Sequence, residues 1–168
     1  MSEEMIGRYR HLVENGSDNF QGLGVLQYAP QIQRLIRKTE SKTVLDYGCG
    51  AGFQYEVPHK IHETWGVDVP TLYDPAFGSH DKLPEGKFDA VICSDVLEHV
   101  PFEESEEFIS RLFGYANKFV WASVCCRLAK KEFEDGVNMH VNVQAFWWWQ
   151  AKFAKLSGGK PHLLVETR

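Results

Sequence analysis

Apolar positions along the chain form two kinds of pattern. Continuous apolar runs, which suit buried strands, occur at Val44–Leu45, Phe88–Cys93, Lys118–Val124 and His162–Glu166. Helical spacing of apolar residues follows Pro30, runs from Phe108 to Ala116, and returns from Phe146 to Phe153. Because strands and helices alternate, the pattern predicts an α/β fold: a doubly wound, mainly parallel sheet with helices on both faces.

The second strand has two candidate positions. Trp65–Val69 and Thr71–Asp74 both suit a strand and each carries an acid near its end, but Pro70 lies between them and cannot donate within a central ladder. Only one of the two segments can therefore be the buried strand. The segment Pro75–Lys87 is rich in turn residues and lacks room for a helix plus a further strand, so we expect a shortened fold.

The first strand leads into a glycine-rich loop, Gly48-Cys49-Gly50-Ala51-Gly52. Glycines at every second residue allow positive φ angles and let the backbone approach a ligand that a Cβ would block. Phe53–Val57 predicts a short helix whose N-terminus faces the loop. In an open α/β sheet ligands bind at the carboxyl ends of the strands, so we expect a cleft between this loop and Ser94-Asp95, which end another strand.

The composition of the chain limits the classes of partner that it can bind. The chain has 168 residues, 43% of them apolar, and a net charge of −5. We expect one domain over residues 1–168, with residues 1–28 leading into it. The absence of a general basic field argues against duplex nucleic acid as the main partner. No apolar run approaches the roughly 20 residues of a membrane helix, and the four cysteines form no CxxC pair. We therefore expect a cytoplasmic protein with reduced thiols and no membrane partner.

Two motifs together resemble class I S-adenosylmethionine-dependent methyltransferases of the compact, small-molecule type. They are Leu45-Asp46-Tyr47-Gly48-Cys49-Gly50-Ala51-Gly52 and Phe88-Asp89-Ala90-Val91-Ile92-Cys93-Ser94-Asp95-Val96-Leu97-Glu98-His99-Val100. The resemblance implies a Rossmann-like methyltransferase fold and S-adenosylmethionine as the cofactor. Phe53 agrees, because a dinucleotide loop of the G-x-G-x-x-G type would carry glycine at that position.

The resemblance also implies a set of cofactor-binding residues. The loop residues Tyr47, Gly48, Cys49, Gly50 and Gly52 pass against the ligand, and Asp46 lies near its amino-acid portion. Ser94 and Asp95 form the floor near the methionine. An acid after the second strand binds the ribose hydroxyls, with Asp74 and Asp68 as alternatives, and Asp81 resembles the residue that contacts the adenine amino group.

Catalytic residues are harder to identify, because methyl transfer is an in-line displacement that requires a base only where the acceptor must lose a proton. His140 and His99 are the candidate bases. The acidic run before Phe108 is attributed to the dipole of the following helix, and we expect no metal in the site.

The methyl acceptor is left open by the sequence. We expect a small molecule, sugar or lipid precursor; the alternatives are an RNA or protein acceptor, and a degenerate module that binds the cofactor or only a partner. A single strand follows the Trp147–Trp149 helix, where the resembled family usually ends in an antiparallel pair. The open edge that this leaves is the basis for expecting a homodimer. On that helix the three consecutive tryptophans cannot all face one way, so at least one should meet the sheet.

Overall fold

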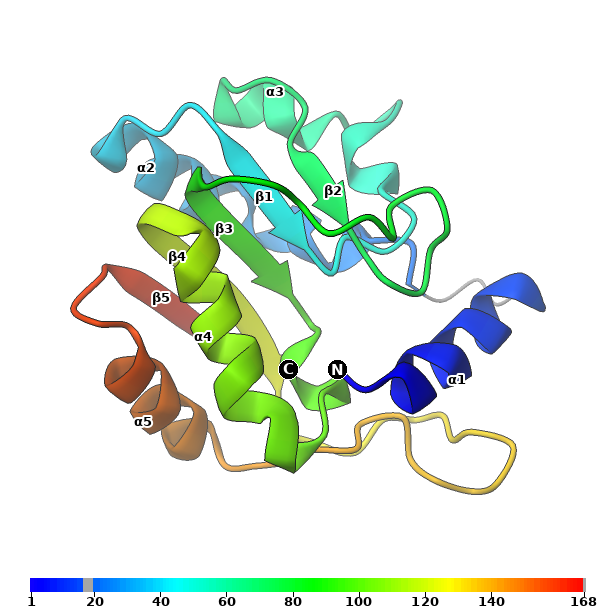
Figure 1. The fold of residues 1–168 in the computed structure, drawn as a ribbon. Helices are drawn as coiled ribbons and strands as arrows, with labels where there is room; N and C mark the ends of the chain where they lie inside the picture. The colour runs from blue at the N-terminus through cyan, green and yellow to red at the C-terminus, as the bar shows by residue number, and fades with distance from the viewer. Residues whose placement is uncertain (17–19, 168) are drawn as a thin grey trace.

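The computed structural model describes residues 1–16 and 20–167 and shows a five-stranded parallel sheet (Figure 1). The strands are β1 (Val44–Tyr47), β2 (Thr71–Tyr73), β3 (Phe88–Ser94), β4 (Ala116–Cys125) and β5 (His162–Thr167). Their order across the sheet is β2-β1-β3-β4-β5, and every neighbouring pair is parallel. The chain reverses its direction of winding beside β1, which puts the topological switch point between β1 and β3. The predicted doubly wound sheet is thereby confirmed.

Helices cover both faces of the sheet. The helices are α1 (Glu3–Glu14), α2 (Ala29–Thr39), α3 (Ile61–Trp65), α4 (Ser105–Tyr115) and α5 (Phe146–Leu156). Successive residues of β3 point to opposite faces, as a strand requires: Val91 packs with α4 and α5, whereas Ile92 packs with α2 and α3. Two separate apolar clusters result, one on each face, and together they fix the sheet as a rigid base for the strand ends.

The structure decides several local predictions made from the sequence. Of the two candidates for the second strand, Thr71–Tyr73 is the strand, and Trp65 instead ends α3 and is buried. The predicted helix at Phe53–Val57 is only a 3₁₀ turn, Phe53–Tyr55. Residues 74–87 connect β2 to β3 without helix or strand, as the turn-rich sequence predicts. The described residues 1–16 and 20–28 contain α1 and the 3₁₀ helix Leu23–Tyr28, although the sequence there has only weak periodicity.

On α5 the three tryptophans point in different directions, as the 100° step of a helix requires. Trp149 is fully buried against the sheet, Trp148 is half-buried, and Trp147 is 69% exposed. Trp149 therefore anchors α5, which supports the expectation that at least one of the three meets the sheet.

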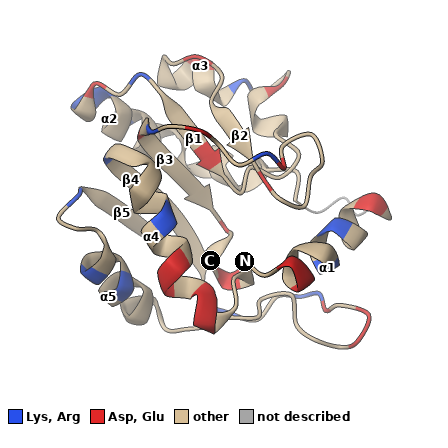
Figure 2. Cartoon of the chain, in the orientation of Figure 1, with Lys and Arg blue, Asp and Glu red and all other residues tan. Residues whose placement is uncertain are grey.

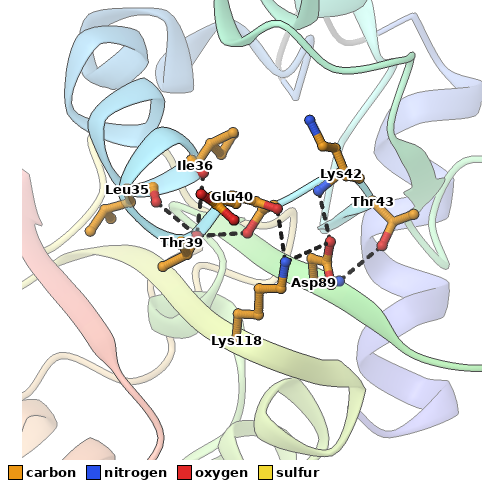
Figure 3. Close-up of polar contacts among 9 residues, drawn as sticks. Leu35, Ile36, Thr39, Glu40, Lys42, Thr43, Asp89 and Lys118 are labelled. Carbon is orange, nitrogen blue, oxygen red and sulfur yellow. Dashed lines mark hydrogen bonds and ion pairs between the residues drawn. The ribbon is translucent and has the colours of Figure 1, made fainter.

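Polar contacts join the amino ends of the strands (Figure 3). Asp89, at the start of β3, accepts the backbone N–H of Lys42 at 2.7 Å and pairs with Lys118 Nζ at 3.3 Å. Lys118 also donates to the Glu40 carbonyl at 2.8 Å. The end of α2 is thus tied to β3 and β4 at the edge of the sheet opposite the carboxyl ends, away from the glycine loop.

A third apolar cluster lies beyond the carboxyl ends of the strands, where α1 packs (Figure 1). Its buried members are Tyr9, Ala76, Phe133 and Met139. Arg8 adds an ion pair with Asp135 at 2.7 Å. We call α1, residues 76–77 and the loop 127–140 the cap, because these three segments close over the strand ends.

No helix in the described part of the chain has the length and apolar character needed to cross a membrane.

Candidate functional site

A cavity of about 550 Å³ lies at the carboxyl ends of β1, β2 and β3, beneath the cap. Small-molecule sites usually measure about 300–1,000 Å³ and occur at this position in α/β sheets. Its polar lining includes Asp46, Asp74, Ser94 and Asp95, and its apolar lining includes Ala76, Phe77 and Leu83. The cavity therefore combines several carboxylates with an apolar wall.

Asp46 is fixed at the end of β1 by two donors. The Tyr55 hydroxyl and the Gln54 amide both donate to Asp46 Oδ2, at 2.7 and 2.9 Å. Burial raises the pKa of Asp46 to about 6, although these two hydrogen bonds act in the opposite direction. Tyr55 and Gln54 come from the 3₁₀ turn after the glycine loop, so this turn orients the carboxylate rather than presenting a helix N-terminus.

The glycine loop approaches the chain's own amino-terminal segment. Gly50 has φ +59°, and a Cβ built there would lie 2.0 Å from the Phe20 carbonyl oxygen. The backbone N–H groups of Ala51 and Phe53 donate to the carbonyls of Phe20 and Gln21. Tyr47, Gly48 and Gly50 line the cavity, whereas Cys49 and Gly52 do not. Position 50 must therefore be glycine because the segment around Phe20, beside the cavity, leaves no space for a Cβ.

The structure places the three acids predicted to bind the ribose or the adenine, Asp68, Asp74 and Asp81, in different positions relative to the cavity. Asp74 directly follows β2 and lines the cavity. Its two carboxylate oxygens accept the backbone N–H groups of Gly50 and Ala76, each at 3.0 Å, while burial raises its pKa. Asp68 and Asp81 are exposed and lie outside the lining.

Ser94 and Asp95 form part of the lining where β3 ends. Asp95 adopts φ +55° and accepts the Ser123 hydroxyl at 2.9 Å. Burial raises its pKa, although the hydrogen bond from Ser123 opposes this effect. A left-handed backbone at a non-glycine residue is uncommon and occurs preferentially at functional sites.

His99 lies where the cavity meets a second, more open groove. The groove is lined by residues of the loop 127–140 and of β4, including Arg127, Lys130 and His140, and it shares Phe20 and His99 with the cavity. Burial lowers the pKa of His99 to about 4. His140 lines the groove only. The two candidate histidines therefore lie together, where the cavity and the groove meet.

The main contribution that the sequence did not reveal comes from the amino-terminal segment. Tyr9, Phe20, Gly22 and Gly24 all line the cavity. A Cβ at Gly24 would lie 2.8 Å from Asp95 Oδ2, so this segment runs directly against the floor of the site. The one available signal was the pair of glycines, Gly22 and Gly24, which sequence reasoning treats as a turn.

Charge around the site is mainly acidic. Figure 2 shows acidic residues on the first turns of α1 and α4 and on β1. Glu3, Asp46, Asp74 and Asp95 line the cavity, together with the basic side chains of Arg111 and His99. Such a lining favours a ligand that carries positive charge.

A parallel sheet whose switch point carries a glycine loop and a set of carboxylates defines a nucleotide-type cleft of the Rossmann-like class. Within that class, residues 24–156 match the methyltransferase domain family, and the chain belongs to this family. Members use S-adenosylmethionine as the methyl donor, so the protein is a methyltransferase of class I. No curated protein and no solved structure matches the chain.

The cavity suits this donor. S-adenosylmethionine carries an ammonium, a sulfonium, a ribose diol and a flat aromatic adenine ring. The lining provides carboxylates for the first three, and the Ala76–Phe77 and Leu83 wall for the faces of the ring.

Proposed function

We propose that the protein transfers a methyl group from S-adenosylmethionine to a small anionic acceptor, with sugar and lipid precursors as the leading classes. The observation that carries this proposal is the junction at His99 and Phe20, where the acidic cavity meets the more open groove. The cavity suits a cationic donor, and Arg127 and Lys130 in the groove suit a phosphate or carboxylate on the acceptor.

In this arrangement Asp74 binds the ribose diol. Each of its oxygens already accepts one backbone N–H and retains a lone pair for a hydroxyl. Asp46 binds the ammonium of the methionine portion, and the backbone at Gly48 and Gly50 passes along the ligand. Ser94 and Asp95 then lie toward the sulfonium, between the donor and the groove.

The chain's residues contribute mainly by positioning. The acceptor's lone pair attacks the methyl carbon in line with the breaking carbon–sulfur bond, whose electrons remain on sulfur as a thioether. Holding the acceptor in the groove replaces a bimolecular encounter with an oriented one. Where the cap covers the cavity, it reduces the contact of the ligand with water, which strengthens the electrostatic contacts there. The base roles of His99 and His140 stay predictions.

We further propose that residues 1–168 act as one methyltransferase domain in which residues 1–16 and 20–28 cover the site. The packing of α1 in the cap supports this. The four cysteines are free thiols, which supports the expected cytoplasmic location.

Calorimetric titration with S-adenosylmethionine and S-adenosylhomocysteine tests donor binding, and we expect micromolar affinity. Asp74→Asn should weaken binding by about 10-fold, equivalent to about 1.4 kcal/mol, whereas Asp68→Asn, an exposed matched control, should leave it unchanged. Equal effects of the two substitutions would contradict the assignment of Asp74. A folded protein that binds neither ligand would indicate a degenerate module.

The acceptor is tested by transfer of a labelled methyl group to a panel of phosphorylated and carboxylated small molecules, with RNA and protein in parallel. Label on a small acceptor, reduced by Arg127→Ala, is the expected result. Transfer confined to RNA or protein would overturn the small-molecule proposal.

A further inference from the structure

Three side chains with metal-binding atoms converge beside the cavity. Glu98 and His99 belong to the 3₁₀ helix Leu97–His99 after β3, and His140 comes from the cap loop. One ligand atom from each residue lies within 4.8 Å of the others. The two imidazole rings are 5.0 Å apart between centroids and nearly perpendicular, at 82°. Neither ring stacks on the other, so both can direct a nitrogen toward a common point.

Backbone carbonyls fix the tautomer of both histidines. His140 Nδ1 lies 2.6 Å from the Arg127 carbonyl oxygen, and His99 Nδ1 lies 3.0 Å from that of Met139. A carbonyl oxygen only accepts, so Nδ1 carries the proton in each neutral ring and Nε2 keeps its lone pair. Metal-binding histidines are oriented by the same kind of contact, a second ring nitrogen donating to a carbonyl or carboxylate.

Tyr9 reinforces the orientation of His99. Its hydroxyl donates to the Met139 carbonyl at 2.8 Å and lies 2.9 Å from His99 Nδ1, whose N–H it can accept. The aromatic side chain of Tyr9 is itself buried in the cap. The ring of His99 is therefore held by two elements that are distant in sequence, α1 and the loop 127–140.

The buried carboxylate of Glu98 is a second, independent indication that a cation binds here. Its side chain is 1% exposed, and Oε1 accepts the backbone N–H of Cys125 at 3.1 Å. Its other oxygen, Oε2, is buried and has no hydrogen-bond partner within the described part of the chain. An unpaired buried carboxylate oxygen is costly, and a cation is a partner that satisfies it.

We propose that Glu98, His99 and His140 bind one divalent first-row transition metal such as Zn²⁺, through one carboxylate oxygen and the two Nε2 atoms. Two imidazoles and one carboxylate form a donor set that suits zinc or iron, whereas magnesium and calcium prefer oxygen ligands throughout. Three protein ligands leave a coordination position open, and His99 places that position where the cavity meets the groove.

Metal binding at this site is an alternative to two expectations from the sequence: that no metal binds, and that His99 or His140 acts as a free base. A bound metal takes the lone pair that a base would use. The proposal of a metal site depends on the geometry of Glu98, His99 and His140 and not on the identity of the methyl acceptor.

The test is titration of the full chain, freed of metal by a chelator, with Zn²⁺ alone. We expect one equivalent to bind. Glu98→Gln and His140→Ala should each weaken binding by about 100-fold or more, since loss of even an outer-shell partner weakens metal sites by about 10- to 100-fold. The matched control is His59→Ala, at an exposed histidine outside the site, which should bind as the unaltered chain does.

His140 is in a surface loop, so its substitution keeps the test valid even if Glu98→Gln does not fold. Absence of zinc binding, or equal binding by all variants, would overturn the proposal. Co²⁺ provides a second measurement: a sulfur-to-cobalt charge-transfer band would assign the ion to thiolates, with Cys125 nearest in the groove, and would also overturn it. S-adenosylmethionine titrations of the same samples separate failure of this site from failure of the proposed function.

Discussion

The contact between Gly50 and the amino-terminal segment permits a quantitative prediction for Gly50→Ala. Two costs add. The first is the left-handed backbone, φ +59°, which costs an alanine about 1–2 kcal/mol. The second is displacement of Phe20, whose carbonyl oxygen lies 2.0 Å from the new Cβ. Moving Phe20 and the adjoining Gln21 breaks two hydrogen bonds, from Ala51 to the Phe20 carbonyl and from Phe53 to the Gln21 carbonyl, at about 0.5–1.5 kcal/mol each. The free energy of unfolding should therefore fall by about 2–5 kcal/mol.

Gly66→Ala is the matched control for the backbone cost. Gly66 ends α3 at φ +74°, and a Cβ there meets nothing within 4 Å. This variant should lose only the first cost, about 1–2 kcal/mol, and should bind S-adenosylmethionine normally. Gly50→Ala should also bind it about 10-fold more weakly, because the displaced segment lines the cavity.

Urea unfolding and calorimetric titration of both variants measure the two effects. Limited proteolysis after residue 20 should be faster in Gly50→Ala than in Gly66→Ala. Equal stabilities, or unchanged cofactor affinity in Gly50→Ala, would refute the reasoning that the loop and the amino-terminal segment form one structure.

Three further predictions concern the core, the cavity and the opposite edge of the sheet. Trp149→Ala should cost about 3–5 kcal/mol in urea unfolding, against less than about 0.5 kcal/mol for the exposed Trp147→Ala; similar losses would contradict the packing of α5. Because burial raises the pKa of Asp46 to about 6, its charge is lost as the pH falls through that value. S-adenosylmethionine affinity measured by calorimetry should fall in the same range, and Asp46→Asn should abolish this pH dependence. The backbone N–H of Lys42 is the main cause of the lowered pKa of Asp89, with Lys118 adding to it. This carboxylate stabilises the fold above its unfolded pKa of about 3.9, and the stabilisation is lost as the pH falls through the folded pKa. Asp89→Asn should therefore cost about 1–2 kcal/mol near neutral pH and progressively less in acid unfolding experiments; a constant difference would contradict the ion pair.

Local sequence patterns were sufficient to predict the sheet and the part of the site that lies at the ends of its strands. The apolar runs in β1 and β3 and the acid at the end of each required only neighbouring residues to be recognised. Pro70 excluded a strand that spans both candidate segments, but the sequence offered no choice between them. The choice depends on Trp65, which packs against α2 and Tyr55 and so belongs to α3.

The rest of the site depends on contacts between distant segments. Tyr9 reaches Met139 and His99, and Glu98 is buried against β4, none of which has a periodic signature. A histidine in a polar loop such as His140 looks the same in sequence whether or not a carboxylate lies opposite. Pattern reasoning therefore predicts where strands end, but not which loops close over those ends.

The cap has a consequence for how the protein moves. Its apolar cluster has four buried members, whereas the clusters on the two faces of the sheet are much larger. Segments with few buried contacts open at a lower free energy than the global unfolding transition. Amide hydrogen exchange in α1 should therefore be faster than in β3 and β4. Opening of the cap exposes the cavity, so ligand exchange and amide exchange of α1 should report the same motion.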